Sequence, residues 1–598
     1  MKRCPECRRD YYDDTLLYCL EDGTALVQGS VPSPDEPTTA ILSGLGVPPL
    51  GGSGSAGDEG QTRSFNNTTE QTAIFNTGAA AKPPINLGDS AEKHSFSANR
   101  AAKPLAALVL AVLILVGGFF GYKYFAPAKQ IESIAVMPFV NESGNADVEY
   151  LCDGMTETLI SSLSQLANLN VKGRSSVFRY KGKDLDTKTL GKELGVQAVL
   201  NGRVIQRGEQ LTLSLELLDA VTENVIWSGK YDRKQADVVS LQSEIARDVS
   251  NKLKSKLSGA DTAKVEKGYT ADPDAYRLYL QGRFYWNKRT AEDLKKSIGY
   301  FEQAIARDPG YALAYSGLGA VYQVIPGYTS DPPPEVVYPK ARTFSLKALE
   351  IDPTLAEPHA TLAVALHEYE WKHQEAESEF KRAIELDPNY PSSHQWYGNF
   401  LLNMGRSKEG VAEMERAIEL DPLSPIINSN LAKAYRADHR YDDAIAQYKK
   451  TLELMPNFQI AQFHLGNTYI LKGMYEEAID IGRQLMLSAN IPQAEVDKRI
   501  SELRNAYRNS GAKGFWQNVI EHDMEDARNS GRETDPHVLA GDQLRAGNKE
   551  EALNSLEKAV ALGPAKTQIL SLKAEPVWDP LRAEPRFKEI LRKIGIPE

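Results

Sequence analysis

The sequence predicts a multidomain protein: an α-solenoid of helical repeats, preceded by a small α/β domain, one transmembrane helix and a short metal-binding knuckle. Three observations lead to this prediction. A proline-closed phrase recurs every 34 residues in the carboxy-terminal half, residues 105–122 form an uncharged apolar run, and three of the four cysteines lie in the first nineteen residues. The predicted boundaries are 1–28 for the knuckle, 29–103 for a linker, 104–126 for the membrane helix, 131–258 for the α/β domain, 272–488 for the repeats, 489–535 for an irregular helical region and 536–598 for a terminal repeat and cap.

The apolar run reads LAALVLAVLILVGGFFGY and is flanked by basic residues on both sides. At about 1.5 Å per residue, a helix of this length crosses most of the roughly 30 Å of bilayer hydrocarbon. A buried core helix would carry a polar face, and this run has none. It also begins too far from the amino terminus to be a signal peptide. We therefore expect a single membrane-spanning helix.

The composition suits several folded domains. Of the 598 residues 42% are hydrophobic and 25% are charged, as in ordinary globular proteins. The net charge is −11 and the chain contains no long basic tract, so we expect no nucleic-acid partner.

The first segment carries a candidate zinc site. Cys4-Pro-Glu-Cys7 forms a turn that points two thiolates at one position, Cys19 can add a third ligand, and Asp22 can add the fourth. The segment resembles a truncated zinc ribbon, in which Asp22 stands where a second CxxC pair would end. The alternative is a metal-free knuckle of three reduced thiols. Four closed ligands leave no open position, so a bound zinc would have a structural or recognition role.

The linker is rich in proline, glycine and serine and has few large apolar residues, so we expect a flexible tether. Two similar tetrapeptides, TAIL at 39–42 and TAIF at 72–75, follow acidic and threonine residues. They are either phosphothreonine docking sites or chance similarities in a threonine-rich segment.

From residue 131 the pattern is that of an α/β domain. A buried strand at 133–139 precedes a helix at 153–167, a strand at 169–173 and a helix at 187–194. Antiparallel strands follow at 197–207, 210–218 and 224–231, and residues 240–257 read as an amphipathic connecting helix. We expect Asp153 to cap the first helix and Cys152 to be a small core residue.

Three phrases in this domain, AVMPF (135–139), YLCDGMTETLISSLS (150–164) and VLNGRVIQRGEQLTLSLELLDA (199–220), resemble the TolB-like amino-terminal domain of bacterial membrane proteins. The resemblance implies a non-enzymatic module outside the cytoplasm with a role in assembly or sensing. It supplies no catalytic residue.

The remainder is periodic. Pro388, Pro422 and Pro456 close similar phrases and are 34 residues apart, which is the period of the tetratricopeptide repeat. Ala376 and Phe380 stand in the second helix of one unit, where small and large residues pack neighbouring helices. We count six or seven repeats. An insertion of ten residues near 326–334 belongs on the surface of the solenoid, and residues 577–597 read as a terminal cap.

The concave face of such an array, lined by the first helix of each unit, is the expected binding surface. Amide and basic groups there suit the backbone or carboxylate of an extended peptide, and the alternative is an ordinary solvated face. The predicted partner-binding residues are Gln395, Asn399, Asn403, Lys433, Arg436 and Asn467, with Phe463 beside them.

Enzyme signatures are missing from the sequence. Residues 367–371 lack the second histidine of HExxH, and there is no phosphate loop, GxSxG elbow or kinase motif set. We therefore expect no catalysis.

The function predicted from these features is that of a scaffold in the bacterial inner membrane. The knuckle and tether would be cytoplasmic and the repeats periplasmic, because reduced cysteines favour a reducing compartment for the amino terminus. The alternative is a transmembrane receptor that relays ligand binding to the zinc-ribbon segment.

Overall fold

The computed structural model describes residues 2–3, 10–11, 27–28 and 131–598, apart from 167, 254–257, 260–262, 265–266, 330–331, 490, 530, 532 and 565–568. Residues 130–598 belong to one compact unit. At the amino terminus, β1 (Lys2–Arg3) pairs antiparallel with β2 (Asp10–Tyr11) and β3 (Val27–Gln28).

Several predictions concern residues that the structure does not describe. The tether at 29–103, with its two tetrapeptides at 39–42 and 72–75, lies outside the described residues. The zinc ligands Cys4, Cys7, Cys19 and Asp22 lie outside the described residues, as does the apolar run at 105–122. Within the described part of the chain, no helix has both the length and the apolar character needed to cross a membrane.

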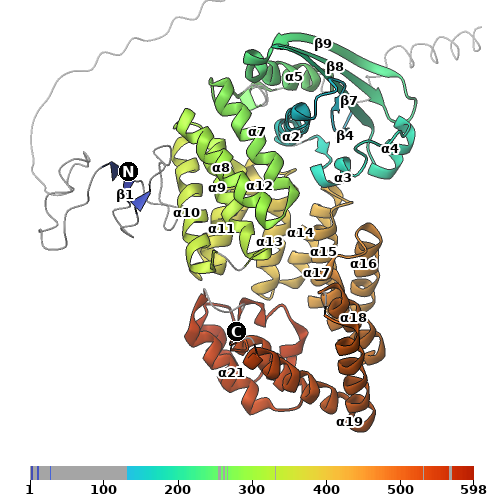
Figure 1. The fold of residues 1–598 in the computed structure, drawn as a ribbon, viewed down its shortest axis with the longest axis vertical. Coiled ribbons are helices and arrows are strands. Elements are labelled where there is room, and N and C mark those ends of the chain that lie inside the picture. Colours follow the sequence, from blue (N-terminus) through green and yellow to red (C-terminus); the bar gives the residue numbers. More distant parts are fainter. Residues whose placement is uncertain are drawn as a thin grey trace, which may run out of the picture. The chain divides into compact units, whose positions relative to one another are not determined.

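A sheet of six strands organises the α/β domain (Figure 1). The strands β6 (Asn170–Val171), β4 (Ser133–Val136) and β7 (Ala198–Arg207) run parallel, and β8 (Gln210–Asp219) and β9 (Val225–Lys234) continue the sheet antiparallel. β5 (Val140–Asn141) pairs with the later part of β7. In β8 alternate leucines are buried, so this strand places one face in the core. The strands predicted at 197–231 are confirmed.

The helices of this domain are α2 (Glu149–Ser164), α3 (Arg174–Phe178), α4 (Thr187–Leu194) and α5 (Val238–Leu253), with short 3₁₀ turns η2 (Ala146–Val148) and η3 (Gln235–Asp237). α4 begins where the Asp186 side chain accepts a hydrogen bond from the Thr189 amide, and it ends at Gly195 in the left-handed conformation. These bounds are those that the sequence predicts for the second helix.

Three details of this domain differ from the sequence prediction. Asp153 does not cap the first helix, because α2 begins at Glu149 and places Asp153 inside the helix, 2.5 Å from the Lys181 ammonium group. α5, predicted as an amphipathic connecting helix at 240–257, is amphipathic as expected but is also part of the domain, since it buries Leu241, Ile245 and Val249 and packs on α2 and β9. The helix α3 was not predicted. Cys152 is fully buried, as expected of a core residue.

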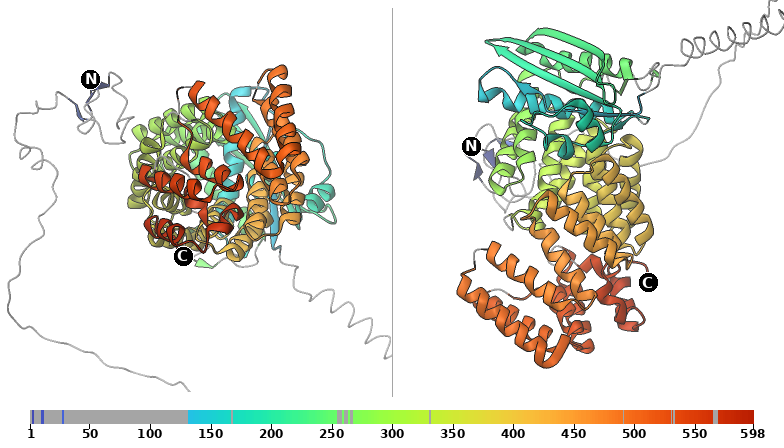
Figure 2. Two further views of the ribbon diagram at one scale, coloured as in Figure 1. Left: turned by 90° about the horizontal axis from the view of Figure 1, so that it is seen from below. Right: turned by 90° about the vertical axis from the view of Figure 1, so that its right-hand side faces the viewer.

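The repeats form antiparallel helix pairs that stack in chain order (Figure 2). Each second helix buries small and large side chains in the predicted register, as Ala376, Phe380 and Ala383 do in α12. The pairs are α7 (Pro273–Lys288) with α8 (Ala291–Arg307), α9 (Ala312–Val324) with α10 (Pro334–Ile351), α11 (Ala356–Glu368) with α12 (His373–Leu386), α13 (Pro391–Asn403) with α14 (Ser407–Leu420), α15 (Pro425–Ala437) with α16 (Tyr441–Leu454), and α17 (Gln459–Leu471) with α18 (Tyr475–Ser488).

The region predicted as irregular is another helical hairpin. α19 (Gln493–Asn529) is interrupted at Gly511, whose φ of +60° breaks the helix. Its two halves run antiparallel, because Arg499 pairs with Asp526 at 2.7 Å and Glu502 pairs with His522 at 3.2 Å.

The carboxy-terminal part contains the helix pair α20 (Pro536–Arg545) and α21 (Lys549–Leu562), the 3₁₀ turns η6 (Ile569–Leu572) and η7 (Pro576–Leu581), and α22 (Pro585–Lys593). Trp578 and Phe587 are buried in its core, against which Trp371 and Met404 of the earlier repeats also pack. The tail therefore covers its own helix pair, as a cap does, and also contacts the middle of the array.

One hydrophobic core joins the α/β domain to the first repeats. It extends without a break from Ile134 in β4 to Ala348 in α10. At the junction, Gly154 of α2 faces Leu280 of α7, and a Cβ atom on Gly154 would lie 2.8 Å from Leu280 Cδ2. This close approach fixes α2 against the concave side of the first repeats.

Candidate functional site

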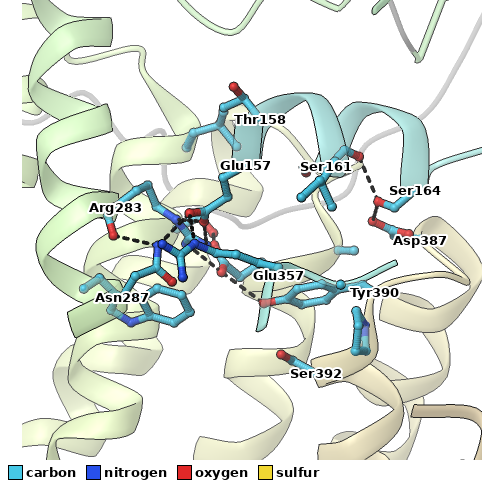
Figure 3. Close-up of a pocket in the computed structure, with 18 of the residues that line it drawn as sticks. Glu157, Thr158, Ser161, Ser164, Arg283, Asn287, Glu357, Asp387, Tyr390 and Ser392 are labelled. Atoms are coloured by element: carbon cyan, nitrogen blue, oxygen red, sulfur yellow. Dashed lines mark hydrogen bonds and ion pairs between the residues drawn. The ribbon is translucent and has the colours of Figure 1, made fainter. Parts of the chain in front are cut away.

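A cavity of about 870 Å³ lies between α2 and the first helices of the repeats (Figure 3). One wall is the polar face of α2, with Glu157, Thr158, Ser161 and Ser164. The opposite wall consists of aromatic and polar side chains from α7, α9, α11 and α13, among them Tyr279, Arg283, Trp286, Ser316, Glu357, Tyr390 and Gln395. A volume of this size accommodates several residues of a peptide or a small organic ligand.

A charge network spans the cavity from one wall to the other. Arg283 of α7 pairs with Glu157 of α2 at 2.5 Å and with Glu357 of α11 at 2.9 Å (Figure 3). Arg174 pairs with the second oxygen of Glu157 at 3.2 Å, and the Asn287 amide donates to the same oxygen at 2.6 Å. The network therefore ties four elements of the chain together, α2, α3, α7 and α11.

Glu357 is also fully engaged. Its carboxylate accepts hydrogen bonds from the Ser316 hydroxyl at 2.7 Å and from the Tyr390 hydroxyl at 3.2 Å, besides the Arg283 ion pair. These groups lie on three different repeat units, so the carboxylate holds the concave wall in one arrangement.

The electrostatics of the network favour the ionised forms. Burial opposes ionisation of Glu157, but the guanidinium groups of Arg283 and Arg174 outweigh it and hold the pKa of this carboxyl below its usual range. Burial likewise disfavours the charge on Arg283, and the carboxylates of Glu157 and Glu357 raise its pKa well above the ordinary value. The network is thus a wall of fixed, paired charges and provides no free acid or base.

The end of α2 is fastened to the repeats by buried carboxyl groups. The Ser164 hydroxyl donates to Asp387 at 2.7 Å, and the Asn389 amide donates to the Ser164 carbonyl at 2.8 Å. Burial raises the pKa of Asp387 to about 6. Asp421 accepts from the backbone amide of Ser176 at 2.7 Å, so the segment after α2 is held in the same way.

Of the predicted partner-binding residues, one lines the cavity and three lie elsewhere on the first helices of the repeats. Gln395 lines the cavity and is 8% exposed. Asn399, Lys433 and Asn467 are half-buried on the first helices, as the register predicts. Phe463, beside them, is exposed.

Arg436 and Asn403 are engaged inside the chain. Arg436 is 2% exposed and pairs with Glu575 at 2.6 Å. Asn403 lies 3.1 Å from the His367 ring nitrogen Nε2. The carboxy-terminal residue Glu575 thus covers Arg436, whereas Asn403 contacts a neighbouring repeat helix. That these two side chains bind a partner stays a prediction.

The charged residues of the cavity were missed at the level of sequence, although a signal exists. Arg283 stands among aromatic residues in RLYLQGRFYW on a first helix, and Glu157 is the one carboxylate in a run of apolar and hydroxyl residues on α2 at 154–164. The loop near 326–334 is predicted on the surface of the solenoid, and the sequence does not show that its residues Pro326 and Tyr328 also border the cavity. Among the described residues, no group of three or more His, Cys, Asp or Glu is placed to hold a metal ion.

Comparison with protein-family models matches three segments. Residues 129–248 match "HilA/YgeH-like transcriptional regulator, second domain", and residues 379–412 and 429–494 match tetratricopeptide repeat models. The TolB-like assignment of the α/β domain is not shown by these matches and stays a prediction.

One curated relative is "Putative adenylate cyclase 3" of Rhizobium meliloti (strain 1021), 32% identical over 245 residues. The match covers 40% of this chain and 40% of that protein, so the chain spans well under half of the relative.

Among solved structures, YrrB, described as a TPR protein with an unusual peptide-binding site, is 18% identical with a TM-score of 0.25 and matches 34% of this chain and 97% of its own. A thermophilic TPR protein of Thermus thermophilus, TTC0263, is 20% identical with a TM-score of 0.28 and matches 33% of this chain and 99% of its own. From the family-model matches and the helix pairs, the carboxy-terminal region is an array of tetratricopeptide repeats, and it follows a small α/β domain.

Proposed function

We propose that this protein is a single-pass membrane scaffold that binds an extended segment of a partner protein in the cavity between α2 and the repeats. Tetratricopeptide repeats are typical of protein-interaction scaffolds. The observation that carries the proposal is the cavity itself, about 870 Å³ in volume, with walls fixed by the Glu157–Arg283–Glu357 network. A preorganised wall reduces the entropy that binding must overcome.

The chemistry of the walls favours binding over catalysis. The charged groups of the network are paired with one another, and the remaining lining is rich in tyrosine, tryptophan and serine. Aromatic side chains give large contact areas to apolar groups, and hydroxyl and amide groups can pair with a peptide backbone.

The membrane part of the proposal rests on the sequence. The uncharged run at 105–122 would anchor the chain, with the knuckle of Cys4, Cys7, Cys19 and Asp22 in the bacterial cytoplasm holding a structural zinc ion, and with a TolB-like domain and repeats outside it. Zinc analysis of the full chain beside a Cys4→Ser, Cys7→Ser variant tests the metal, with one zinc per chain expected only in the unchanged protein.

A second candidate is a transmembrane receptor that relays ligand binding to the amino-terminal segment. The names of one matched family model and one matched protein favour it, because a transcriptional regulator and an adenylate cyclase are both outputs of signalling pathways. In this case the α/β domain and repeats would form a sensing region, and related proteins would join such a region to different output domains.

A cavity-filling variant tests binding in the cavity. Ser161 lies on the cavity wall of α2, and Ser378 is exposed on the second helix α12, away from the cavity. In pull-downs with the full chain, we expect partners to bind the unchanged protein and the Ser378→Trp control, and to be lost with Ser161→Trp. Partners retained by Ser161→Trp would contradict binding in the cavity.

Deletion of residues 1–28 separates the two candidates. If the partner still binds and the cellular response to it is lost, the protein is a receptor. If both are unchanged, the scaffold role is supported.

A further inference from the structure

We propose that the part of the cavity beside Trp286 and Arg289 binds a carboxylate group of the ligand. This inference rests on the proposed function, because it names the chemistry that the same cavity recognises. The partner segment would therefore present either an acidic side chain or its carboxyl terminus at this position.

Arg289 provides a positive charge that the described part of the chain leaves unbalanced. It follows the last residue of α7, and its guanidinium lies 3.7 Å from the centroid of the Trp286 ring. Arg283 stacks on the same ring at 4.2 Å but is neutralised by Glu157 and Glu357. Among the described residues no carboxylate forms an ion pair with Arg289, although it lines the cavity.

The surroundings make this charge costly without a ligand. Burial lowers the pKa of Arg289 and outweighs the opposite effect of the nearby Tyr328, Tyr390 and Glu357, and the neighbouring Arg283 lowers the pKa further. Arg289 also has a φ of +56°, a conformation that residues other than glycine rarely adopt. An anion placed here would supply the missing counter-charge.

Buried polar atoms without partners line the same cavity. The Trp286 indole N–H has no hydrogen-bond acceptor within the described residues, and Trp286 is 7% exposed. The Tyr311 hydroxyl is also without a partner in this part of the chain. A buried donor without an acceptor costs about 1–3 kcal/mol, so a ligand that supplies an acceptor gains this energy.

The donor set suits a carboxylate. A guanidinium group matches the two oxygens of a carboxylate with parallel hydrogen bonds, and an indole N–H is a donor only. The nearby aromatic residues Tyr279, Tyr328 and Tyr390 would contact the apolar part of the ligand. Glu157 and Glu357 do not repel it fully, since both are paired with Arg283.

The first test uses a small probe and the full chain. 4-Hydroxyphenylacetate carries a carboxylate on a tyrosine-like ring, and 4-hydroxyphenylacetamide is its uncharged match. We expect the acid to raise the thermal unfolding midpoint by about 2–4 °C and the amide to leave it unchanged. Arg289→Met should abolish the shift. The control Arg277→Met removes a half-buried arginine of α7 that pairs with Asp274 and does not line the cavity, and it should retain the shift.

The second test identifies the source of the carboxylate. Pools of random octapeptides with free or amidated carboxyl termini are selected on the immobilised full chain and read by mass spectrometry. Enrichment of Asp and Glu in both pools assigns the site to an acidic side chain. Retention of peptides from the free-acid pool alone assigns the site to the carboxyl terminus. Arg289→Met should reduce either enrichment by about tenfold.

Other outcomes separate the two proposals. Peptides that bind without preference for a carboxylate would overturn the carboxylate site and leave the scaffold function standing. Binding of 4-hydroxyphenylacetate without binding of any peptide would keep the site and overturn the peptide-binding function. An equal shift with acid and amide, a shift retained by Arg289→Met, or no shift together with no peptide enrichment would overturn the carboxylate site.

Discussion

At the scale of single residues, the geometry of the cavity depends on buried charges that form ion pairs with one another. Glu157 is close to two guanidinium groups and one amide, and all three come from other segments of the chain. A buried ion pair contributes little net stability while it is intact, but removal of one partner leaves the other charge uncompensated. The network therefore fixes geometry more than it adds stability.

Glu157→Gln tests this view of the network. The substitution leaves Arg283 with one carboxylate in place of two and Arg174 without its ion pair, so we expect the free energy of unfolding of the full chain to fall by about 3 kcal/mol. Urea denaturation measures the change. Glu292→Gln, which removes the exposed partner of Lys296, should leave the midpoint unaltered. An equal effect of both substitutions would contradict a special role for the buried pair.

Asp387 gives a pH dependence of known sign. Burial raises its pKa to about 6 in the folded protein, above the ordinary value of 3.8, so the folded state binds the proton more tightly than the unfolded state. The stabilisation is complete below about pH 4 and is lost as the pH rises through about 6, a change of about 3 kcal/mol. We expect Asp387→Asn, which cannot ionise, to remove this part of the pH dependence. Denaturation of both proteins at pH 4.5 and 7.5 checks it, and parallel curves would contradict the assignment.

At the scale of elements, the carboxy-terminal segment acts on the middle of the repeat array. Ala574 is buried together with Leu402, Leu431 and Ala434, and Glu575 neutralises Arg436. This segment thus occupies the concave side where the register placed a binding surface. The cavity beside the first repeats remains available for a ligand, and Ile426 of α15 and Ile460 of α17 also line it. The carboxy-terminal segment covers the part of the concave side around Arg436.

Removal of the Glu575 charge should loosen this contact. Glu575→Gln leaves Arg436 buried without a counter-charge, and we expect hydrogen exchange to increase in η6, η7 and α15. Hydrogen-exchange mass spectrometry measures the protection of these elements. Asp579→Asn serves as the matched control, because its partner His439 is exposed and the pair is accessible to water. Unchanged protection in Glu575→Gln would show that the apolar contacts hold the segment alone.

A pair of histidines couples the end of the chain to α11 and α12. His373 Nε2 lies 2.8 Å from the Ile594 carbonyl oxygen and must carry the proton there, so its Nδ1 accepts from His367 Nδ1, also at 2.8 Å. The free His367 Nε2 then accepts from Asn403. Every position is satisfied only when both rings are neutral. Burial lowers the pKa of His367 to about 3 and also lowers that of His373.

Acid should therefore weaken the docking of the tail. Because both folded pKa values are depressed, the stabilisation is present above about pH 6.5 and is lost as the pH falls. We expect the exchange protection of residues 585–598 to be lower at pH 5 than at pH 7.5. In His373→Gln a non-titrating donor faces Ile594, and the protection should depend less on pH. A similar dependence in that variant would assign the effect to other groups.

At the scale of the whole molecule, the α/β domain and the first repeats form one cooperative structure. Their shared core runs from β4 to α10, and Gly154 of α2 lies against Leu280 of α7. A destabilising substitution at this junction should lower the stability of both parts, because neither can bury its apolar face without the other.

Two glycine substitutions test this cooperativity. Gly299 in α8 has open space around it, so Gly299→Ala should stabilise the protein by about 0.5–1 kcal/mol through helix propensity. Gly154→Ala gains the same propensity but overlaps Leu280, and we expect a net loss of about 1–2 kcal/mol. In the Gly154→Ala variant, hydrogen exchange should show reduced protection both in β4 and β7 of the α/β domain and in α7 and α8 of the repeats. Reduced protection in one part alone would show that the two unfold separately.

The sequence by itself determined the elements and the repeat. Alternating leucines specify β8, and the 34-residue recurrence of Pro388, Pro422 and Pro456 specifies the helix pairs, because both periods are written in contiguous residues. The amphipathic pattern of 493–529 was harder to use, since its phase changes at Gly511. Because of this break, the sequence pattern does not reveal that the region is a helical hairpin.

Only the tertiary structure decided the candidate site. Glu157 and Arg283 are 126 residues apart, Arg283 and Glu357 are 74 apart, and Arg436 and Glu575 are 139 apart. No local period relates such positions. Their meeting depends on the angle at which α2 docks on the repeats and on the return of the tail to the middle of the array. Arg289 stands out for the same reason, because its lack of a carboxylate partner among the described residues is visible only when all neighbouring segments are in place.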